Sequence, residues 1–235
     1  SPFSRKIAPI NDSQQSDIIL SSIFNLFFLF GIIINFSKFK DFDISKHFFL
    51  FTNEANFLDL LSTGVKAVRD NSSSIKIIMH YAGINGSSWF FNKLNTIDYD
   101  IIGLSYYPIW HGKNLNQLQA TIVSLGTTYN KEVIIAETAY PFTLQWNDFT
   151  NNIVGLEEQL ILPDYPATSQ GQKDYLAKIK EILVSTSNGI GFCYWEGALV
   201  SFQGPNSTNG SPWENQALYD FENKALPIFN EFNIN

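Results

Sequence analysis

The chain has 235 residues, and its 45% hydrophobic content is sufficient to bury a core in one large or two small domains. A formal net charge of −7, with only 15 lysines and arginines, argues against nucleic acid as a partner, because phosphates need clustered basic side chains. The single cysteine, Cys193, excludes an internal disulfide. His47, His80 and His111 lie too far apart in the sequence to form a local metal-binding motif.

The first 52 residues differ in character from the rest of the chain. Residues 18–36 are 19 consecutive uncharged residues, and three lysines follow closely. A run of about 20 apolar residues can span a bilayer, so this segment is a candidate membrane helix and the one part expected to contact a membrane. Two other interpretations remain open. The segment is either buried in a globular domain or not native coding sequence, since its Phe-, Ile-, Leu- and Asn-rich composition, with lysines close behind, is typical of translated AT-rich DNA.

From residue 53 to residue 235 we predict one domain in which helical periodicity alternates with short apolar runs. Helices are expected at 55–70, 87–97, 114–129 and 169–187. Strands are expected at 75–81, 99–107, 131–137 and 190–195. Ser169 and Gln172 have the spacing of a capping box, which predicts that they open the last helix.

This alternation predicts an α/β fold with a parallel sheet. Four such strands are half of a (β/α)8 barrel, which typically needs about 250 residues, so we expect an incomplete TIM barrel. The alternative is an open doubly wound sheet, but no Gly-rich phosphate loop follows any predicted strand.

Each predicted strand ends in side chains suited to binding a sugar. The four strand ends read His80-Tyr81, Ser105-Tyr106-Tyr107-Pro108 with Trp110 and His111, Glu137-Thr138-Ala139-Tyr140, and Tyr194-Trp195-Glu196. His80, Tyr106 or Trp195 alone is more often explained by core packing. In a barrel of this type, however, the carboxyl ends of the strands form the active-site cleft, and here all four agree.

Glu137 carries most of the functional argument. A carboxylate at the end of a buried strand is unfavourable unless it is paired or used in chemistry. An ion pair is one explanation, but Arg5 and Arg69 are the only arginines in the chain. The other is a glycosidase carboxylate that faces an anomeric carbon.

Several segments resemble the endo-β-1,4-galactanases of glycoside hydrolase family 53. They are DYDIIGLSYYPIWHG (98–112), EVIIAETAYPF (132–142), GLEEQLILPDYPATSQGQKDYL (155–176), GFCYWEGALV (191–200) and SPWENQALYDF (211–221). These blocks follow the order of the family and cover residues 55–235 almost without a gap. The resemblance implies strands five to eight of a (β/α)8 barrel.

The resemblance also implies a function, which is retaining hydrolysis of the β-1,4-galactan side chains of pectin by a secreted enzyme. No signal peptide is visible in the chain. Glu137 is expected to be the nucleophile, and seven residues are expected to line the sugar subsites: His80, Tyr106, Tyr107, Trp110, His111, Trp195 and Glu196. No redox cofactor is expected. Some members of the family bind structural calcium, but no local run of ligands allows a metal site to be assigned here.

The sequence departs from the family in two places. Gly197 stands where the family usually has proline, and Leu199 stands where an aromatic residue is common. The acid/base glutamate of the family belongs to an Asn-Glu pair after strand four, and residues 1–52 contain no glutamate. Asn53-Glu54 resembles that pair, but it is also explained as the capped start of the next helix. The alternative function is therefore a catalytically inactive remnant that at most binds sugar.

Overall fold

The computed structural model of the chain describes residues 53–232. The candidate membrane segment at 18–36 and the rest of residues 1–52 lie outside this range. Between residues 53 and 232, no helix combines the length and the apolar character needed to cross a bilayer.

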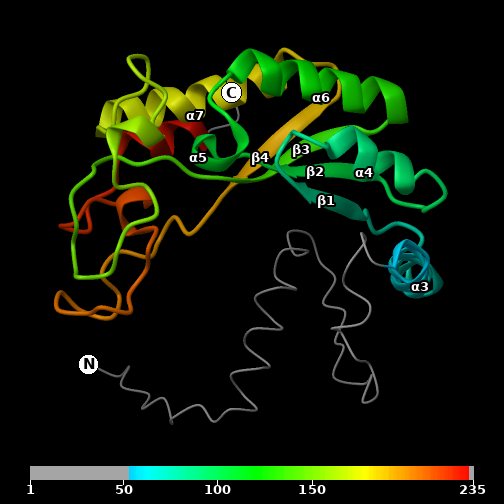
Figure 1. Ribbon diagram of the computed structural model, residues 1–235, viewed down its shortest axis with the longest axis horizontal. Coiled ribbons are helices and arrows are strands. Elements are labelled where there is room, and N and C mark those ends of the chain that lie inside the picture. The colour runs from blue at the N-terminus through cyan, green and yellow to red at the C-terminus, as the bar shows by residue number, and fades with distance from the viewer. Residues whose placement is uncertain (1–52, 233–235) are drawn as a thin grey trace, which may run out of the picture.

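Four parallel strands form one sheet, and they lie side by side in the order in which they occur in the chain (Figure 1). They are β1 (Ile78–Ala82), β2 (Ile101–Ser105), β3 (Glu132–Thr138) and β4 (Gly189–Tyr194). All four predicted strands are therefore confirmed. Neighbouring parallel strands need a crossover connection, and a helix lies in each connection of this sheet.

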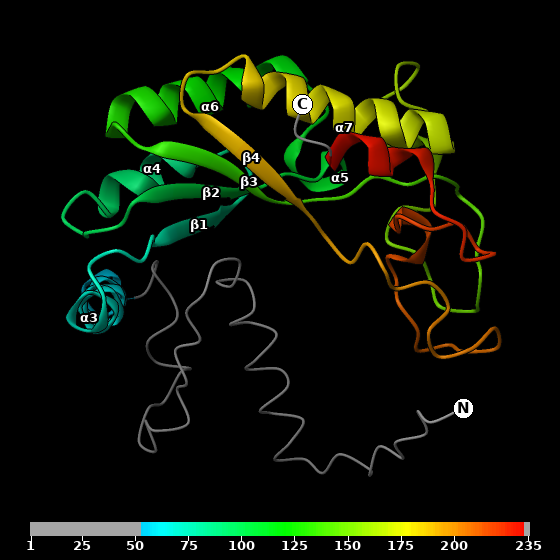
Figure 2. The same ribbon diagram turned by 180° about the vertical axis from the view of Figure 1, so that it is seen from behind.

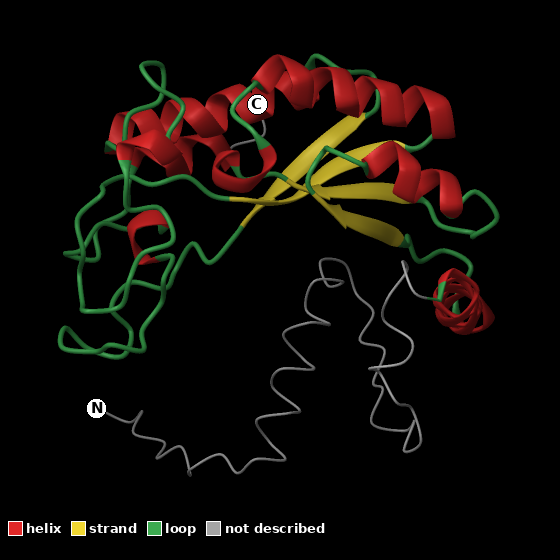
Figure 3. Cartoon of the chain, viewed as in Figure 1, coloured by secondary structure: helices red, strands yellow, loops and turns green. Residues whose placement is uncertain are grey.

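Three helices cover one face of the sheet (Figure 3). They are α4 (Ser87–Lys93), α6 (Leu115–Tyr129) and α7 (Ser169–Val184). The helix α3 (Glu54–Asn71) precedes β1 and lies at the end of the molecule away from the long loops (Figure 2). The remaining helical segments are short: α5 (Pro108–His111), η3 (Glu157–Gln159), η4 (Glu214–Gln216) and η5 (Pro227–Phe232).

No helix of residues 53–232 covers the opposite face of the sheet (Figure 1). In a closed barrel this face points to the interior, and the helices form the outer ring. The four βα units are thus a partial (β/α)8 barrel, as the sequence predicted.

The main core lies between the sheet and its helices. On this face Ile102 and Leu104 of β2 and Val133 and Ile135 of β3 are fully buried. They belong to one cluster with apolar residues of the helices, among them Leu118, Ile122, Leu176 and Ile179. A smaller cluster on the other face contains Ile101, Ile134 and Ala136, with Ile78 and Cys193 beside them. Because both faces are apolar, the strands appear in the sequence as continuous hydrophobic runs.

The start of α7 differs from the predicted capping box. Thr168 is the N-cap, and its Oγ1 accepts a hydrogen bond from Gly171 N at 2.9 Å. Gln172 is fully buried, and its Nε2 donates to Tyr140 O at 3.0 Å and to Ala217 O at 2.9 Å. The capping-box prediction was wrong because Gln172 points into the protein, where it ties two loops to the helix.

The close approach of α7 to the preceding loop gives a test of this arrangement. A Cβ atom at Gly171 would lie 2.0 Å from Pro166 O, which is backbone and cannot move aside cheaply. We expect Gly171→Ala to lower the free energy of unfolding by about 1–3 kcal/mol, as overpacked sites do. Urea denaturation followed by circular dichroism measures this change.

Gly155→Ala is the matched control, because the nearest atom to its added Cβ would be Asn152 O at 3.9 Å. We expect this variant to unfold within about 0.5 kcal/mol of the wild type. Equal stability of the two variants would contradict the packing described for α7.

Candidate active site

The carboxyl ends of the four strands meet at one edge of the sheet, and the long loops lie beyond this edge (Figure 1). These loops are residues 106–114 after β2, residues 139–168 after β3 and residues 195–226 after β4. This is the position of the active-site cleft in (β/α)8 enzymes.

Glu137 is the second-last residue of β3, and a β-bulge determines which face of the sheet its side chain points to. The parallel register pairs Leu104 with Ile135 but Ser105 with Glu137, so that Ala136 is the extra residue. Strict alternation would place Glu137 on the helix-covered face with Ile135. The bulge instead brings its carboxylate to Ser105, as bulges near active sites commonly do.

The residue Glu137 is 8% exposed, and its carboxylate receives two hydroxyl hydrogen bonds. Ser105 Oγ donates to Oε2 at 3.1 Å, and Tyr107 OH donates to the same oxygen at 3.2 Å. No lysine or arginine of residues 53–232 forms an ion pair with it, since Arg69 pairs with Asp98 and Asp100. Hydroxyl groups therefore compensate the buried charge, and the ion-pair explanation fails for the described residues.

His80 extends this hydrogen-bonded group onto β1. Its Nε2 lies 2.8 Å from Ser105 Oγ, and the two residues occupy neighbouring strands on the same face. The structure thus joins residues of three strands, His80, Ser105 and Glu137, in one connected chain of polar groups. The sequence placed each at a strand end but did not reveal this connection.

Tyr107 is held as a donor toward Glu137. Burial, and secondly the negative charge of Glu137, raise the pKa of its phenol, so the hydroxyl keeps its proton. Tyr106, which was also expected to line a subsite, points elsewhere. It is fully buried, and its hydroxyl donates to Gly112 O at 2.6 Å.

An aromatic cluster borders the carboxylate. The ring of Trp213 lies 5.1 Å from Tyr107, 5.8 Å from Trp110 and 6.4 Å from Trp195, measured between ring centroids. Trp110 is 53% exposed, so a ligand can reach its surface. Trp213 was missed among the site residues, although the segment SPWEN that contains it was recognised as part of the family pattern.

The remaining predicted site residues support the loops. His111 closes α5, and its Nδ1 accepts a hydrogen bond from Tyr107 N at 3.0 Å. Glu196 follows β4 with a positive φ of 45°, and its Oε2 accepts from Ser211 Oγ at 2.8 Å. Both residues therefore position the segments that carry Tyr107 and Trp213.

Glu54 is placed away from this group. It lies in the first turn of α3, where Asn53 Oδ1 accepts from Asn56 N at 3.1 Å, and it pairs with Lys93 at 3.0 Å. The helix α3 lies at the opposite end of the molecule from the loops after β3 and β4 (Figure 2). Asn53-Glu54 is thus the capped start of a helix, as one of the two interpretations predicted.

The loop after β3 is fixed to the loop after β4 by a buried carboxylate. Glu214 is fully buried, and its Oε1 accepts from Asn147 N at 2.7 Å and from Asp148 N at 3.3 Å. Tyr165 lies edge-on to Tyr175, with ring centroids 6.1 Å apart, which attaches the same loop to α7. Within residues 53–232 no three histidine, cysteine or acidic side chains come together to hold a metal ion.

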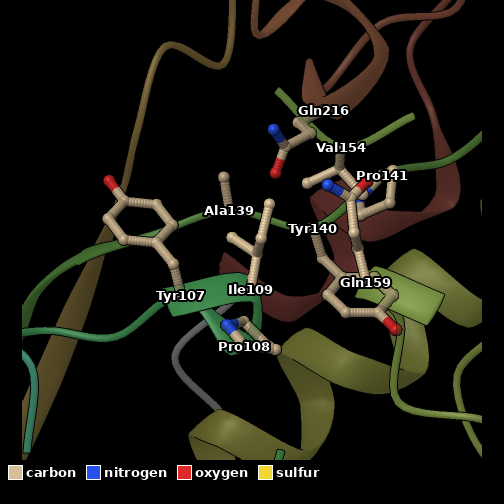
Figure 4. A pocket seen from close by; sticks show the side chains of 9 residues that line it. All are labelled: Tyr107, Pro108, Ile109, Ala139, Tyr140, Pro141, Val154, Gln159 and Gln216. Carbon is tan, nitrogen blue, oxygen red and sulfur yellow. The ribbon is translucent and has the colours of Figure 1, made fainter. Parts of the chain in front are cut away.

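A small cavity lies between α5 and the loop after β3, next to the rim of the site, by which we mean the aromatic cluster around Trp213 (Figure 4). Its lining includes Ile109, Ala139, Val154 and Gln216, while the hydroxyl end of Tyr107 points away from them. Its volume of about 10 Å³ is about the minimum that a single water molecule needs. A sugar ring therefore does not fit in this cavity.

Comparison with known proteins gives a consistent result. Residues 42–232 match the sequence profile described as Glycosyl hydrolase family 53. The chain is 42% identical over 180 residues to an arabinogalactan endo-beta-1,4-galactanase of Cellvibrio japonicus, covering 72% of this chain and 47% of that protein. It is 29% identical to an endo-beta-1,4-galactanase of Bacillus subtilis, covering 77% and 50%.

A solved structure supports the same fold. The GH53 catalytic domain of Ignisphaera aggregans superposes with a TM-score of 0.69 at 32% identity, covering 76% of this chain and 51% of that one. The chain spans about half the length of the curated relatives it matches.

The contact between His111 and Tyr107 predicts how stability depends on pH. Burial lowers the pKa of His111 below its ordinary value of 6.5 in the folded protein, where Nδ1 must stay unprotonated to accept the Tyr107 N–H. The unfolded chain therefore binds the proton more readily. We expect the free energy of unfolding to be highest above pH 6.5 and to fall as the pH drops below that value.

His111→Gln is the control, because the amide oxygen of glutamine accepts the same hydrogen bond without titrating. In this variant, the urea denaturation midpoint should change less between pH 5 and pH 8 than it does in the wild type. The same change of midpoint with pH in both proteins would show that His111 does not contribute to the pH dependence of stability.

Proposed function

Because the chain belongs to glycosyl hydrolase family 53, we propose that it is the catalytic C-terminal half of a retaining endo-β-1,4-galactanase with Glu137 as nucleophile. The observation that carries this proposal is the Glu137 carboxylate, buried at a strand end and held by Ser105 and Tyr107 on one oxygen only. No donor of residues 53–232 contacts Oε1, so this oxygen is available to react.

The chemistry follows from this arrangement. Oε1 attacks the anomeric carbon of a galactosyl unit, and the bond to the departing sugar oxygen breaks as a galactosyl ester forms. A second carboxyl group protonates the departing oxygen and later removes a proton from the water that hydrolyses the ester. The product then keeps the β configuration of the substrate.

The substrate class is inferred from the rim and from the relatives. Trp110, Trp195 and Trp213 offer apolar ring faces beside Glu137, which suit the C–H faces of a pyranose. The Cellvibrio relative is an arabinogalactan endo-beta-1,4-galactanase, and the Bacillus relative is an endo-beta-1,4-galactanase. We therefore infer β-1,4-galactan, a pectin side chain, as the substrate. A polymer of this size is reached outside the cell, so we infer a secreted enzyme.

One observation favours a second candidate function, which is sugar binding without turnover. Glu54 forms an ion pair with Lys93 and lies in the first turn of α3, so it is not the acid/base group of this site. If this chain acts without any other acid group, the rim binds galactan but hydrolyses it slowly, since general acid catalysis contributes about 10²–10⁴-fold.

Substitution of the nucleophile separates the two candidates. We expect Glu137→Gln to lower reducing-sugar release from β-1,4-galactan by at least about 10³-fold, because an amide oxygen does not form the ester. Glu132→Gln, at the exposed start of the same strand, is the control and should retain full activity. Galactan binding by both variants, with no release by the wild type, would support the binding function instead.

The aromatic rim is tested by binding. Trp110→Ala should weaken the affinity for β-1,4-galactotetraose by about tenfold, because one exposed stacking surface is lost. Trp89→Ala removes a comparably exposed tryptophan from α4, on the helical side of the sheet, and should leave the affinity unchanged. Isothermal titration calorimetry measures both values. Equal losses in the two variants would mean that the sugar does not bind at this rim.

A further inference from the structure

Ser105 is placed between a histidine and the reactive carboxylate. It is 2% exposed, and its Oγ lies 2.8 Å from His80 Nε2 and 3.1 Å from Glu137 Oε2. Gly103, two residues earlier on β2, leaves room for Ile78, since a Cβ there would lie 2.9 Å from Ile78 Cγ2 and in ordinary contact, at 3.5 Å, with His80 Cβ.

The proton inventory of these three groups fixes the direction of both hydrogen bonds. An ionised carboxylate only accepts, and a serine hydroxyl has a single proton to donate. If Ser105 gives this proton to Glu137, its oxygen must accept from His80, and Nε2 then carries a hydrogen. The opposite assignment directs the Ser105 proton to Nε2 and leaves two oxygen lone pairs facing each other at 3.1 Å, which is unfavourable in a buried site.

We propose that Ser105, which accepts a hydrogen bond from the Nε2–H of His80, is a positioning residue. Its hydroxyl keeps Glu137 Oε2 engaged as a hydrogen-bond acceptor, so that Oε1 is the oxygen that attacks the anomeric carbon. This inference rests on the proposed nucleophilic role of Glu137. His80 then acts through Ser105 and not by contact with the sugar.

The same hydrogen bond assists the second half of the reaction. In the galactosyl ester Oε1 is bonded to the anomeric carbon, and Oε2 is the carbonyl oxygen that faces Ser105 and Tyr107. When an incoming nucleophile displaces the carboxylate, the electron pair of the C–Oε1 bond returns to it and spreads over both oxygens. Donors at Oε2 stabilise this charge, so they favour departure of the carboxylate.

Nitrogen NMR of the full chain tests the proton assignment without requiring turnover. We expect Nε2 of His80 to carry a hydrogen at neutral pH, with the signal assigned by its disappearance in His80→Gln. A spectrum with an unprotonated Nε2 on His80 would overturn the proposal, because Ser105 would then donate to the histidine.

The rate at which the galactosyl ester on Glu137 breaks down tests whether Ser105 assists departure of the carboxylate. The probe is 2,4-dinitrophenyl 2-deoxy-2-fluoro-β-galactoside, whose leaving group departs as the phenolate without a protonating acid. Azide, which needs no general base, then displaces the ester, and intact-mass spectrometry follows loss of the fluorogalactosyl group. We expect Ser105→Ala to slow this release by about tenfold, since one hydrogen bond to a developing charge is lost.

The variants of His80 separate positioning from packing. His80→Gln keeps an N–H donor near the Nε2 position and should release the sugar within about threefold of the wild type, whereas His80→Leu should resemble Ser105→Ala. Equal rates in Ser105→Ala and the wild type would overturn the positioning role. Failure of the wild type to be labelled at all would instead reject the proposed function, while the NMR result would still decide the proton assignment.

Discussion

The burial of one carboxylate at the end of β3 is the constraint on which the site depends. Among residues 53–232, Glu137 is compensated by the hydroxyls of Ser105 and Tyr107 and not by a cation. A cation would neutralise the group by occupying its oxygens, whereas two donors on Oε2 stabilise the charge and leave Oε1 available. In the proposed mechanism, this distribution of donors lets the buried carboxylate act as a nucleophile through Oε1.

The fold supplies this arrangement through the sheet edge. The bulge at Ala136 brings Glu137 to the face where Ser105 and His80 lie, and α5 turns the chain after β2 so that Tyr107 reaches the same oxygen. His111 holds that turn through the Tyr107 N–H, and the loop containing Trp213 is fixed by Glu214. The apolar core fixes the strands and helices, and backbone contacts from these elements position the groups around Glu137.

Much of the fold and part of the site were predictable from the sequence, for physical reasons. Strands buried on both faces appear as apolar runs, and helices show their periodicity, so the βα order and the position of Glu137 at a strand end were clear. The capped start at Asn53-Glu54 was one of two interpretations. The role of Gln172, the burial of Tyr106 and the inclusion of Trp213 were not predictable. They depend on contacts between residues far apart in the chain, such as Gln172 with Ala217 and Tyr107 with Trp213.

The attachment site of a mechanism-based label tests the central claim most directly. The chain is treated with 2,4-dinitrophenyl 2-deoxy-2-fluoro-β-galactoside and digested, and tandem mass spectrometry locates the fluorogalactosyl group. The account predicts a single modified peptide from residues 132–142, with the sugar on Glu137. A label on any other carboxylate, Glu196 for example, would contradict the assignment of the nucleophile.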